Sequence, residues 1–292
     1  MGLSDRHRMM REQKFSTSSA QIHVAVDHSE GPPIVLLHGV TRCGRDWLPL
    51  APALREFGQL HILDHRGHGN SSRAANYRVA DYVEDTVAYV ASLRPPVTLI
   101  GHSLGAMVAA GTAAALGDRI RGVVLEDPTF EMTATRIHET AFPDNFRAYL
   151  KHCGSNQPTA QIARDLADAL IRVPGLPEPV RFGTLRDAAA LRFTAYCLKR
   201  LDPNVLPLII EERWLEGYDV PRTLKSITCP VLFLQGDFAA GGALPDDYAA
   251  ELVRDIKDCT HLKMIGVGHG IHGTQPIAML NLVAPFLASL EP

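Results

Sequence analysis

The sequence predicts an α/β fold: a mostly parallel sheet flanked by helices and interrupted by one helical insertion. Two observations support this prediction. Short, continuously apolar runs alternate along the chain with stretches of helical periodicity, which is typical of parallel strands joined by crossover helices. The alternation then stops over residues 128–222, where the hydrophobic pattern is helical and indicates an insertion between two strands.

Seven segments are expected to form strands of this sheet. Residues 21–26 alternate apolar and polar side chains, which indicates a half-buried strand. Most of the others are continuous apolar runs, of the kind that a parallel sheet buries on both faces. The expected strands are 21–26, 34–37, 60–63, 97–100, 122–125, 231–234 and 263–267, and the helical patterns between them cover 47–57, 79–93, 104–116, 245–256 and 276–290.

The insertion predicts how the chain is organised into domains. Its helical patterns cover 133–151, 159–171, 185–200 and 205–214, and a proline-rich segment at 174–179 is expected to be a loop. We therefore expect an α/β core domain made of residues 21–128 and 222–292, with a helical cap at 129–221. Residues 1–20 are expected to form a flexible N-terminal tail, because the first part of this segment is polar and lacks the apolar stretch of a secretory signal.

Composition restricts the classes of partner. The 292-residue chain has a formal net charge of −3, so it offers no general electrostatic attraction for nucleic acid or an anionic membrane. Its five cysteines are scattered without a C-x-x-C spacing, which indicates neither a disulfide framework nor a zinc site and favours a reducing, cytoplasmic location. We expect a small-molecule substrate and no nucleic-acid or membrane partner, and the sequence leaves the oligomeric state open.

The most informative motif is the pentapeptide Gly101-His102-Ser103-Leu104-Gly105. It has the form G-x-S-x-G and lies between an apolar run at 97–100 and a run of small residues at 106–110, which predicts a strand, a sharp turn and a helix. A serine on such a turn is held in a strained conformation with its hydroxyl exposed above the sheet. Ser103 is therefore the candidate nucleophile.

Three further motifs accompany the pentapeptide. His38-Gly39-Val40 follows one expected strand, Asp64-His65-Arg66-Gly67-His68-Gly69-Asn70-Ser71 follows the next, and Gly268-His269-Gly270 comes late in the chain. With these four motifs in this order, the chain resembles the α/β-hydrolase family from about residue 21 onward. The resemblance implies an eight-stranded, mostly parallel sheet, often covered by a helical cap, and a serine-esterase type of active site.

The resemblance assigns roles to several residues. His269 is the expected base for Ser103, because a serine hydroxyl needs a general base at neutral pH, and His272 in the same loop is the nearest rival. The backbone N–H groups of Val40 and Leu104 are expected to form the oxyanion hole. His102 and Trp214 are the candidates for substrate contacts in the pocket.

The acid that partners the base departs from the usual family pattern. That pattern places an aspartate in G-x-x-D after the strand near Val231, but Gly236-Asp237-Phe238-Ala239 has alanine there. Some relatives carry the acid after the preceding strand, where this chain has Asp127. The resemblance therefore implies Asp127 as the acid, with Asp237 as second and Glu126 as third choice. The alternative for Asp127 is a structural role at the strand end, capping a helix or anchoring the cap.

The expected function is that of a serine hydrolase, which cleaves a carboxylic ester or lactone of a small, partly apolar substrate through an acyl-enzyme. The serine disfavours the haloalkane dehalogenases and epoxide hydrolases of this fold, which use a carboxylate nucleophile. An amidase or a C–C bond hydrolase with the same triad is the alternative, and a ligand receptor on a hydrolase scaffold is a non-enzymatic one. No metal or organic cofactor is implied, because no G-x-G-x-x-G follows a strand and no histidine pair has metal spacing on a helix.

Overall fold

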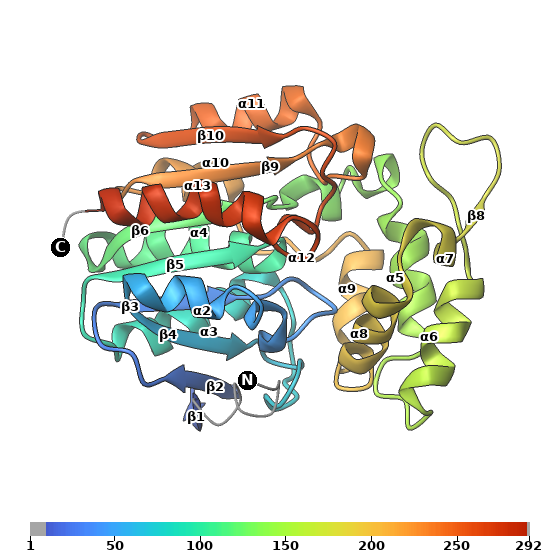
Figure 1. The fold of residues 1–292 in the computed structure, drawn as a ribbon, viewed down its shortest axis with the longest axis horizontal. Coiled ribbons are helices and arrows are strands. Elements are labelled where there is room, and N and C mark those ends of the chain that lie inside the picture. The colour runs from blue at the N-terminus through green and yellow to red at the C-terminus, as the bar shows by residue number, and fades with distance from the viewer. Residues whose placement is uncertain (1–9, 291–292) are drawn as a thin grey trace.

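The computed structural model describes residues 10–290, which form an eight-stranded sheet with helices on both faces (Figure 1). The spatial order is β1-β2-β4-β3-β5-β6-β9-β10; β2 pairs antiparallel with β1 and with β4, and the other neighbours are parallel. The strands are β1 (Met10–Ser16), β2 (Gln21–Asp27), β3 (Pro33–Leu37), β4 (Gln59–Asp64), β5 (Val97–His102), β6 (Ile120–Glu126), β9 (Val231–Gly236) and β10 (Cys259–Met264). The predicted fold class is confirmed.

The helices of the sheet-bearing part cover two apolar faces. They are α2 (Ala51–Leu54), α3 (Val79–Ala91), α4 (Leu104–Leu116), α10 (Val220–Lys225), α11 (Asp246–Arg254), α12 (Ile271–Thr274) and α13 (Pro276–Ser289). Successive residues of β3 point to opposite faces: Val35 packs in the cluster under α3 and α4, whereas Leu36 packs in the cluster under α2 and α13. Burial on both faces explains why the central strands are continuous apolar runs.

Two expectations about strands need correction. Residues 10–16 lie within the expected tail but form β1, which pairs with β2 along its whole length from Met10 opposite Asp27 to Ser16 opposite Gln21. The alternating-apolar signal is weak there because the strand lies at the sheet edge and its side chains are mostly half-buried or exposed. The last strand, expected at 263–267, is β10 at Cys259–Met264; it lies at the opposite edge, where a polar sequence is tolerated. Residues 1–9 of the expected tail lie outside the described residues.

The turn between β5 and α4 has the strained geometry that its sequence predicts. Ser103 has φ of 54° and ψ of −114°, a conformation that non-glycine residues rarely adopt. The two glycines permit the close packing around it. A Cβ on Gly101 would lie 2.1 Å from the carbonyl oxygen of Gly105, and a Cβ on Gly105 would lie 2.0 Å from the carbonyl oxygen of Leu37. The serine is therefore fixed at the carboxyl end of the sheet by backbone contacts on both sides.

Residues 129–221, which follow β6 and reach into the start of α10, are mainly helical and lie at one end of the sheet (Figure 1). This segment contains η4 (Phe130–Thr133), η5 (Ile137–Glu139), α5 (Phe142–Leu150), α6 (Thr159–Asp168), α7 (Phe182–Leu185), α8 (Ala188–Leu198) and α9 (Val205–Ile210). The expected helix 133–151 is instead two short 3-10 turns followed by α5, which has Pro143 in its first turn. The proline-rich loop is closed by the short pair β7 (Leu170–Ile171) and β8 (Val180–Arg181). Among the described helices, none has the length and apolar character needed to cross a bilayer.

Candidate active site

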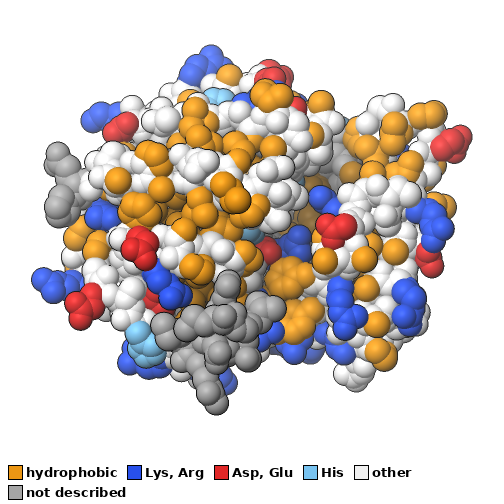
Figure 2. Space-filling model, viewed as in Figure 1, with side chains coloured by type: hydrophobic (Ala, Val, Ile, Leu, Met, Phe, Trp, Pro, Cys, Tyr) orange, Lys and Arg blue, Asp and Glu red, His pale blue; other side chains and the backbone are white. Residues whose placement is uncertain are grey.

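Ser103 opens into a cavity of about 660 Å³ between the carboxyl ends of the strands and residues 129–221. Figure 2 shows the hollow between the larger body and the smaller lobe, with apolar and basic side chains along its walls. Segments from several parts of the chain meet there: Val40 after β3, Ser103 after β5, Thr129 after β6 and His269 after β10. The carboxyl edge of a parallel sheet is where α/β folds bind their ligands.

His269 and Asp127 are joined by a short hydrogen bond. His269 Nδ1–H donates to Oδ2 of Asp127 at 2.7 Å, and the Asp127 side chain is fully buried. The backbone N–H groups of Gly236 and Ala243 also donate to this carboxylate, at 2.9 and 2.8 Å. Because an ionised carboxylate only accepts hydrogen bonds, the bond fixes the proton of His269 on Nδ1 and leaves Nε2 free to accept a proton.

The other two candidate acids lie elsewhere. Asp237 accepts hydrogen bonds from the N–H groups of Gly266 and Ala239, and its carboxylate is 3.6 Å from Nζ of Lys263. It therefore anchors the turn after β10, and no hydrogen bond or ion pair joins it to His269 in the described part of the chain. Glu126 binds His272 instead. Of the three candidate acids, Asp127 alone meets His269.

The pairing of β6 with β9 explains how Asp127 reaches the position expected of an acid after β9. The two strands are parallel neighbours in which Glu126 is opposite Leu234. Asp127 follows directly, with φ of 44°, and its own N–H donates to the carbonyl oxygen of Leu234. The carboxylate then accepts the N–H of Gly236 at the end of β9. The Asp127 side chain, which follows β6, thus lies beside the end of the neighbouring strand β9.

Ser103 and His269 line the same cavity, yet within residues 10–290 no hydrogen bond links the serine hydroxyl to the imidazole. Such bonds are commonly long in a resting enzyme and shorten when substrate binds. The His269 ring is held by its neighbours, with centroids 4.7 Å from the ring of His102 and 5.3 Å from that of Phe142. Its orientation is therefore set by Asp127 on one side and by ring packing on the others.

The two predicted oxyanion donors lie next to the serine in sequence or in space. Leu104 is the first residue of α4, so its N–H has no partner within the helix. Val40 lines the cavity and follows Gly39, which lies against the turn that carries Ser103. A Cβ on Gly39 would lie 2.7 Å from Nδ1 of His102 and 3.3 Å from Cβ of Ser103, so glycine is what lets this loop approach the serine.

A buried ion network behind the serine was not recognised in the sequence. His272 Nδ1–H donates to both carboxylate oxygens of Glu126, at 2.9 and 2.8 Å, and its Nε2 lies 3.2 Å from Oδ2 of Asp46. Burial disfavours the imidazolium, but the charges of Glu126 and Asp46 outweigh this effect and raise the pKa of His272 to about 10. His272 is therefore protonated at neutral pH and ties the loop that carries His269 to the end of β6.

His102 has the opposite protonation state. Burial lowers its pKa to about 3, so the ring is neutral, and its Nε2–H donates to the carbonyl oxygen of His269 at 3.0 Å. Together with Asp46 and His272, it offers one ligand atom to a group whose three atoms lie within 4.8 Å of one another. The carboxylates of Glu126 and Asp46 favour the protonated form of His272, and a nitrogen that carries a proton cannot at the same time bind a metal. We therefore assign this group to the ion network.

Trp214 requires a correction. It was expected to contact substrate, but its side chain is fully buried, and its indole N–H donates to the carbonyl oxygen of Tyr77 at 2.8 Å. It is absent from the cavity wall, whereas His102, the other pocket candidate, is part of it. A large apolar side chain contributes most to stability when buried, and its single polar group finds a backbone acceptor there. Trp214 therefore packs the base of the helical segment.

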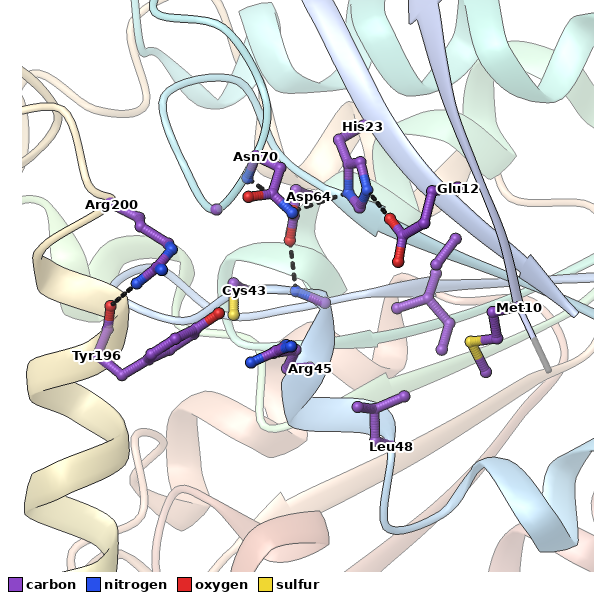
Figure 3. Close-up of a pocket in the computed structure, with 14 residues that line it drawn as sticks. Met10, Glu12, His23, Cys43, Arg45, Leu48, Asp64, Asn70, Tyr196 and Arg200 are labelled. Carbon is purple, nitrogen blue, oxygen red and sulfur yellow. Dashed lines mark hydrogen bonds and ion pairs between the residues drawn. The ribbon is translucent and has the colours of Figure 1, made fainter. Parts of the chain in front are cut away.

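A second, smaller cavity of about 120 Å³ lies beside the first and is shown in Figure 3. At its wall, the Asp64 carboxylate accepts the N–H groups of Gly44 and Asn70 and lies 2.9 Å from Nδ1 of His23. His23 also contacts Glu12. These contacts fasten the loops after β3 and β4 to β2. The cavity contains none of the candidate catalytic residues.

The charge of His272 gives a prediction about stability. In the native state its pKa is about 10, against 6.5 for an unperturbed histidine, so between these pH values the native state binds more protons than the unfolded state. The contribution of the His272 charge to the free energy of unfolding is therefore complete below pH 6.5 and is lost as pH rises to about 10. Each unit of pKa difference corresponds to about 1.4 kcal/mol.

We expect denaturant unfolding to give a lower free energy of unfolding for His272→Gln than for wild type. This difference should narrow as pH rises from 6.5 to about 10. At the lower pH, the variant should lose about 3–5 kcal/mol, the usual effect of leaving a buried charge unpaired. His28→Gln, at an exposed position, is the control and should show no such gap. A gap for His272→Gln that does not vary with pH would contradict the assignment of the charge.

Comparison with known proteins now adds to this geometry. The sequence model of the "Alpha/beta hydrolase family" matches residues 34–281. The chain is 29% identical over 206 residues to a pimeloyl-[acyl-carrier protein] methyl ester esterase of Xanthomonas oryzae pv. oryzae, covering 70% of this chain and 76% of the relative. It is 25% identical over 275 residues to the 2-(acetamidomethylene)succinate hydrolase of Mesorhizobium japonicum. This match covers 89% of this chain and 90% of that relative.

Other matches are partial or show the fold alone. The chain spans about half the length of two further curated relatives, 48% and 46%. The enol-lactonase structure from Burkholderia xenovorans LB400 superposes with a TM-score of 0.70 at 18% identity, covering 95% of this chain and 100% of that one. The family match covers most of the chain and agrees with the eight-stranded sheet. The chain belongs to the alpha/beta hydrolase family.

Proposed function

We propose that this protein is a serine hydrolase that cleaves a carboxylic ester or a lactone through a triad of Ser103, His269 and Asp127. The observation that carries the proposal is the 2.7 Å hydrogen bond from His269 to the buried Asp127, in a cavity that also contains the strained serine. A carboxylate, an imidazole and a serine hydroxyl at one cavity are the groups that acyl transfer needs.

In the first half of the proposed reaction, Nε2 of His269 takes the hydroxyl proton of Ser103 while Oγ attacks the substrate carbonyl carbon. The negative charge that develops on the carbonyl oxygen is stabilised by the N–H groups of Val40 and Leu104, each worth about 3–4 kcal/mol in comparable sites. The tetrahedral intermediate collapses as the bond to the alkoxide breaks, and His269 donates its proton to that alkoxide. An acyl-enzyme remains.

In the second half, His269 takes a proton from water, and the resulting hydroxide attacks the acyl carbon. Collapse of this intermediate breaks the bond to Oγ, and His269 returns the proton to Ser103. The Asp127 carboxylate accepts hydrogen bonds from two backbone N–H groups and from His269. Its role is to hold the imidazole in the correct tautomer and to stabilise the imidazolium.

The cavity supports a small, partly apolar substrate. Phe142 and Phe146 of α5 and Phe193 of α8 contribute apolar surface to its wall, beside polar groups that would orient a ligand. We propose that residues 129–221 act as a cap that shapes the substrate pocket. Esterase and hydrolase relatives support this substrate class, and the name of one relative, a hydrolase of an acetamido-substituted succinate, keeps an amide as the second candidate.

We also propose a cytoplasmic location. The sulfur atoms of Cys43 and Cys197 lie 3.7 Å apart as free thiols, and the remaining three cysteines are also unpaired. The scattered spacing of the five cysteines, without a C-x-x-C pair, supports a reducing compartment.

A fluorophosphonate probe tests the nucleophile directly. We expect it to label the wild-type protein at Ser103 and to leave Ser103→Ala unlabelled, because the strained serine is the only group that the triad activates. The same variant should lose roughly 10⁶-fold in kcat on whichever substrate of an ester, lactone, thioester and amide panel the wild type cleaves best. Ser289→Ala, which changes an exposed serine, is the control. Failure to label the wild type, or unchanged labelling of Ser103→Ala, would refute the mechanism.

Asparagine substitutions distinguish the candidate acids. Asp127→Asn preserves the shape of the side chain but allows the wrong tautomer of His269, so we expect kcat to fall by about 10⁴-fold, as in other triads. Asp237→Asn should retain most of the activity, because Asp237 contacts the turn at Gly266 rather than the histidine. Steady-state kinetics of both variants provides the measurement, and a large loss confined to Asp237→Asn would show that the acid is misassigned.

A further inference from the structure

We propose that the active-site cavity holds a carboxylate group of the substrate through Arg42 and Arg186, so that the preferred substrate is the half-ester of a dicarboxylic acid. This inference rests on the proposed function and deepens it by naming the substrate class. Three arginines line the cavity, Arg42, Arg45 and Arg186, and the argument depends on the first and the last.

Arg42 lines the cavity and is held in place by its neighbours. It lies in the turn after β3, where its N–H donates to the carbonyl oxygen of Gly39, in the loop that contacts the serine. One guanidinium nitrogen, Nη1, donates to Oγ1 of Thr194 at 3.2 Å, and the group lies 5.4 Å from the ring centroid of Phe193. These contacts from α8 fix the plane of the guanidinium, while the side chain remains 29% exposed. An immobilised arginine loses little entropy on binding a carboxylate.

The carboxylate nearest to Arg42 is shared with another cation. Oδ2 of Asp46 lies 3.6 Å from Nε of Arg42, but the same oxygen lies closer, at 3.2 Å, to Nε2 of the protonated His272. Glu126 on the far side of His272 adds a second negative charge. The network is neutral, because the two carboxylates are balanced by His272 and Arg42. No surplus negative charge next to Arg42 therefore competes with a bound carboxylate.

Arg186 supplies a positive charge that is not neutralised. It lies between α7 and α8 and lines the cavity, and within the described residues its guanidinium has no hydrogen bond or ion pair. The adjacent Asp187 accepts the N–H of Ala190 and caps α8, so its charge is directed to the start of that helix. The segment 129–221 therefore presents an available arginine to the same cavity that Arg42 enters from the sheet.

Two polar side chains of α5, Asn145 and Tyr149, line the same cavity as these arginines. Burial raises the pKa of Tyr149, and the positive charges of Arg42 and Arg186 oppose that rise. The side-chain oxygen of Asn145 is buried without a hydrogen-bond partner. Because the two ends of an amide can be exchanged by rotation, Asn145 can also donate to an anion. A carboxylate would satisfy these groups, whereas an alkyl chain would bury them without partners.

The test compares substrates of similar shape that differ in whether they carry a carboxylate. Methyl half-esters of succinic, glutaric and adipic acid are assayed beside the dimethyl esters of the same acids, and the readout is the ratio of kcat/KM for half-ester over diester. We expect the wild type to prefer at least one half-ester by roughly 10- to 100-fold, the range for a charge-assisted hydrogen bond. Arg42→Gln and Arg186→Gln should each lower this ratio at least about tenfold. Arg147→Gln, an exposed arginine of α5 paired with Asp144, is the matched control and should keep the ratio.

A binding measurement tests the carboxylate site without requiring the protein to turn over a substrate. Calorimetry on Ser103→Ala should show tighter binding of succinate, glutarate or adipate than of the corresponding diamide, and the difference should disappear when Arg42→Gln or Arg186→Gln is added. If no ester is cleaved but this arginine-dependent binding is found, the proposed hydrolase chemistry fails and the carboxylate site stands. If the diamides bind as tightly as the dicarboxylates, or if the half-ester preference survives both arginine variants, the carboxylate site is refuted.

Discussion

The geometry of the site depends on two consecutive carboxylates at the end of one strand. Glu126 closes β6 and Asp127 follows it, and each binds a different histidine of the loop after β10: Glu126 binds His272, and Asp127 binds His269. The backbone conformation of Asp127, with a positive φ, turns the second carboxylate away from the first. One strand end therefore both anchors the loop and orients the imidazole that is proposed to act as the base.

The ion pairs that hold the histidine loop also reach the wall of the cavity. Protonated His272 directs Nδ1–H to Glu126 and Nε2–H to Asp46, and Asp46 in turn lies beside Arg42. The charges that hold the histidine loop are thus linked to an arginine that faces the ligand space, while Arg186 enters from the helical segment. Such a chain of paired charges can hold a cavity rigid and leave positive charge at one side of it, as the proposed carboxylate site requires.

Much of this arrangement follows from the sequence, and what does not has physical reasons. The elbow at Ser103 and the central strands were predictable because strained turns need glycine and doubly buried strands need apolar residues at every position. The hydrogen bond between Asp127 and His269 was predictable only through resemblance, since a strand-end aspartate more often has a structural role. The strand β1 was missed because main-chain pairing, rather than apolar side chains, stabilises it. Trp214 was misjudged, and Arg186 overlooked, because a sequence does not reveal which side of a short helical segment faces the sheet.

Proton NMR tests the central interaction, between Asp127 and His269, most directly. A proton held between an imidazole nitrogen and a carboxylate gives a resonance far downfield of the amide region, and the signal of His269 can be assigned by its loss in His269→Gln. We predict that this resonance is lost or shifted strongly upfield in Asp127→Asn and is retained in Asp237→Asn. A resonance that persists unchanged in Asp127→Asn would contradict the account, because the proton of His269 would then be held by another group.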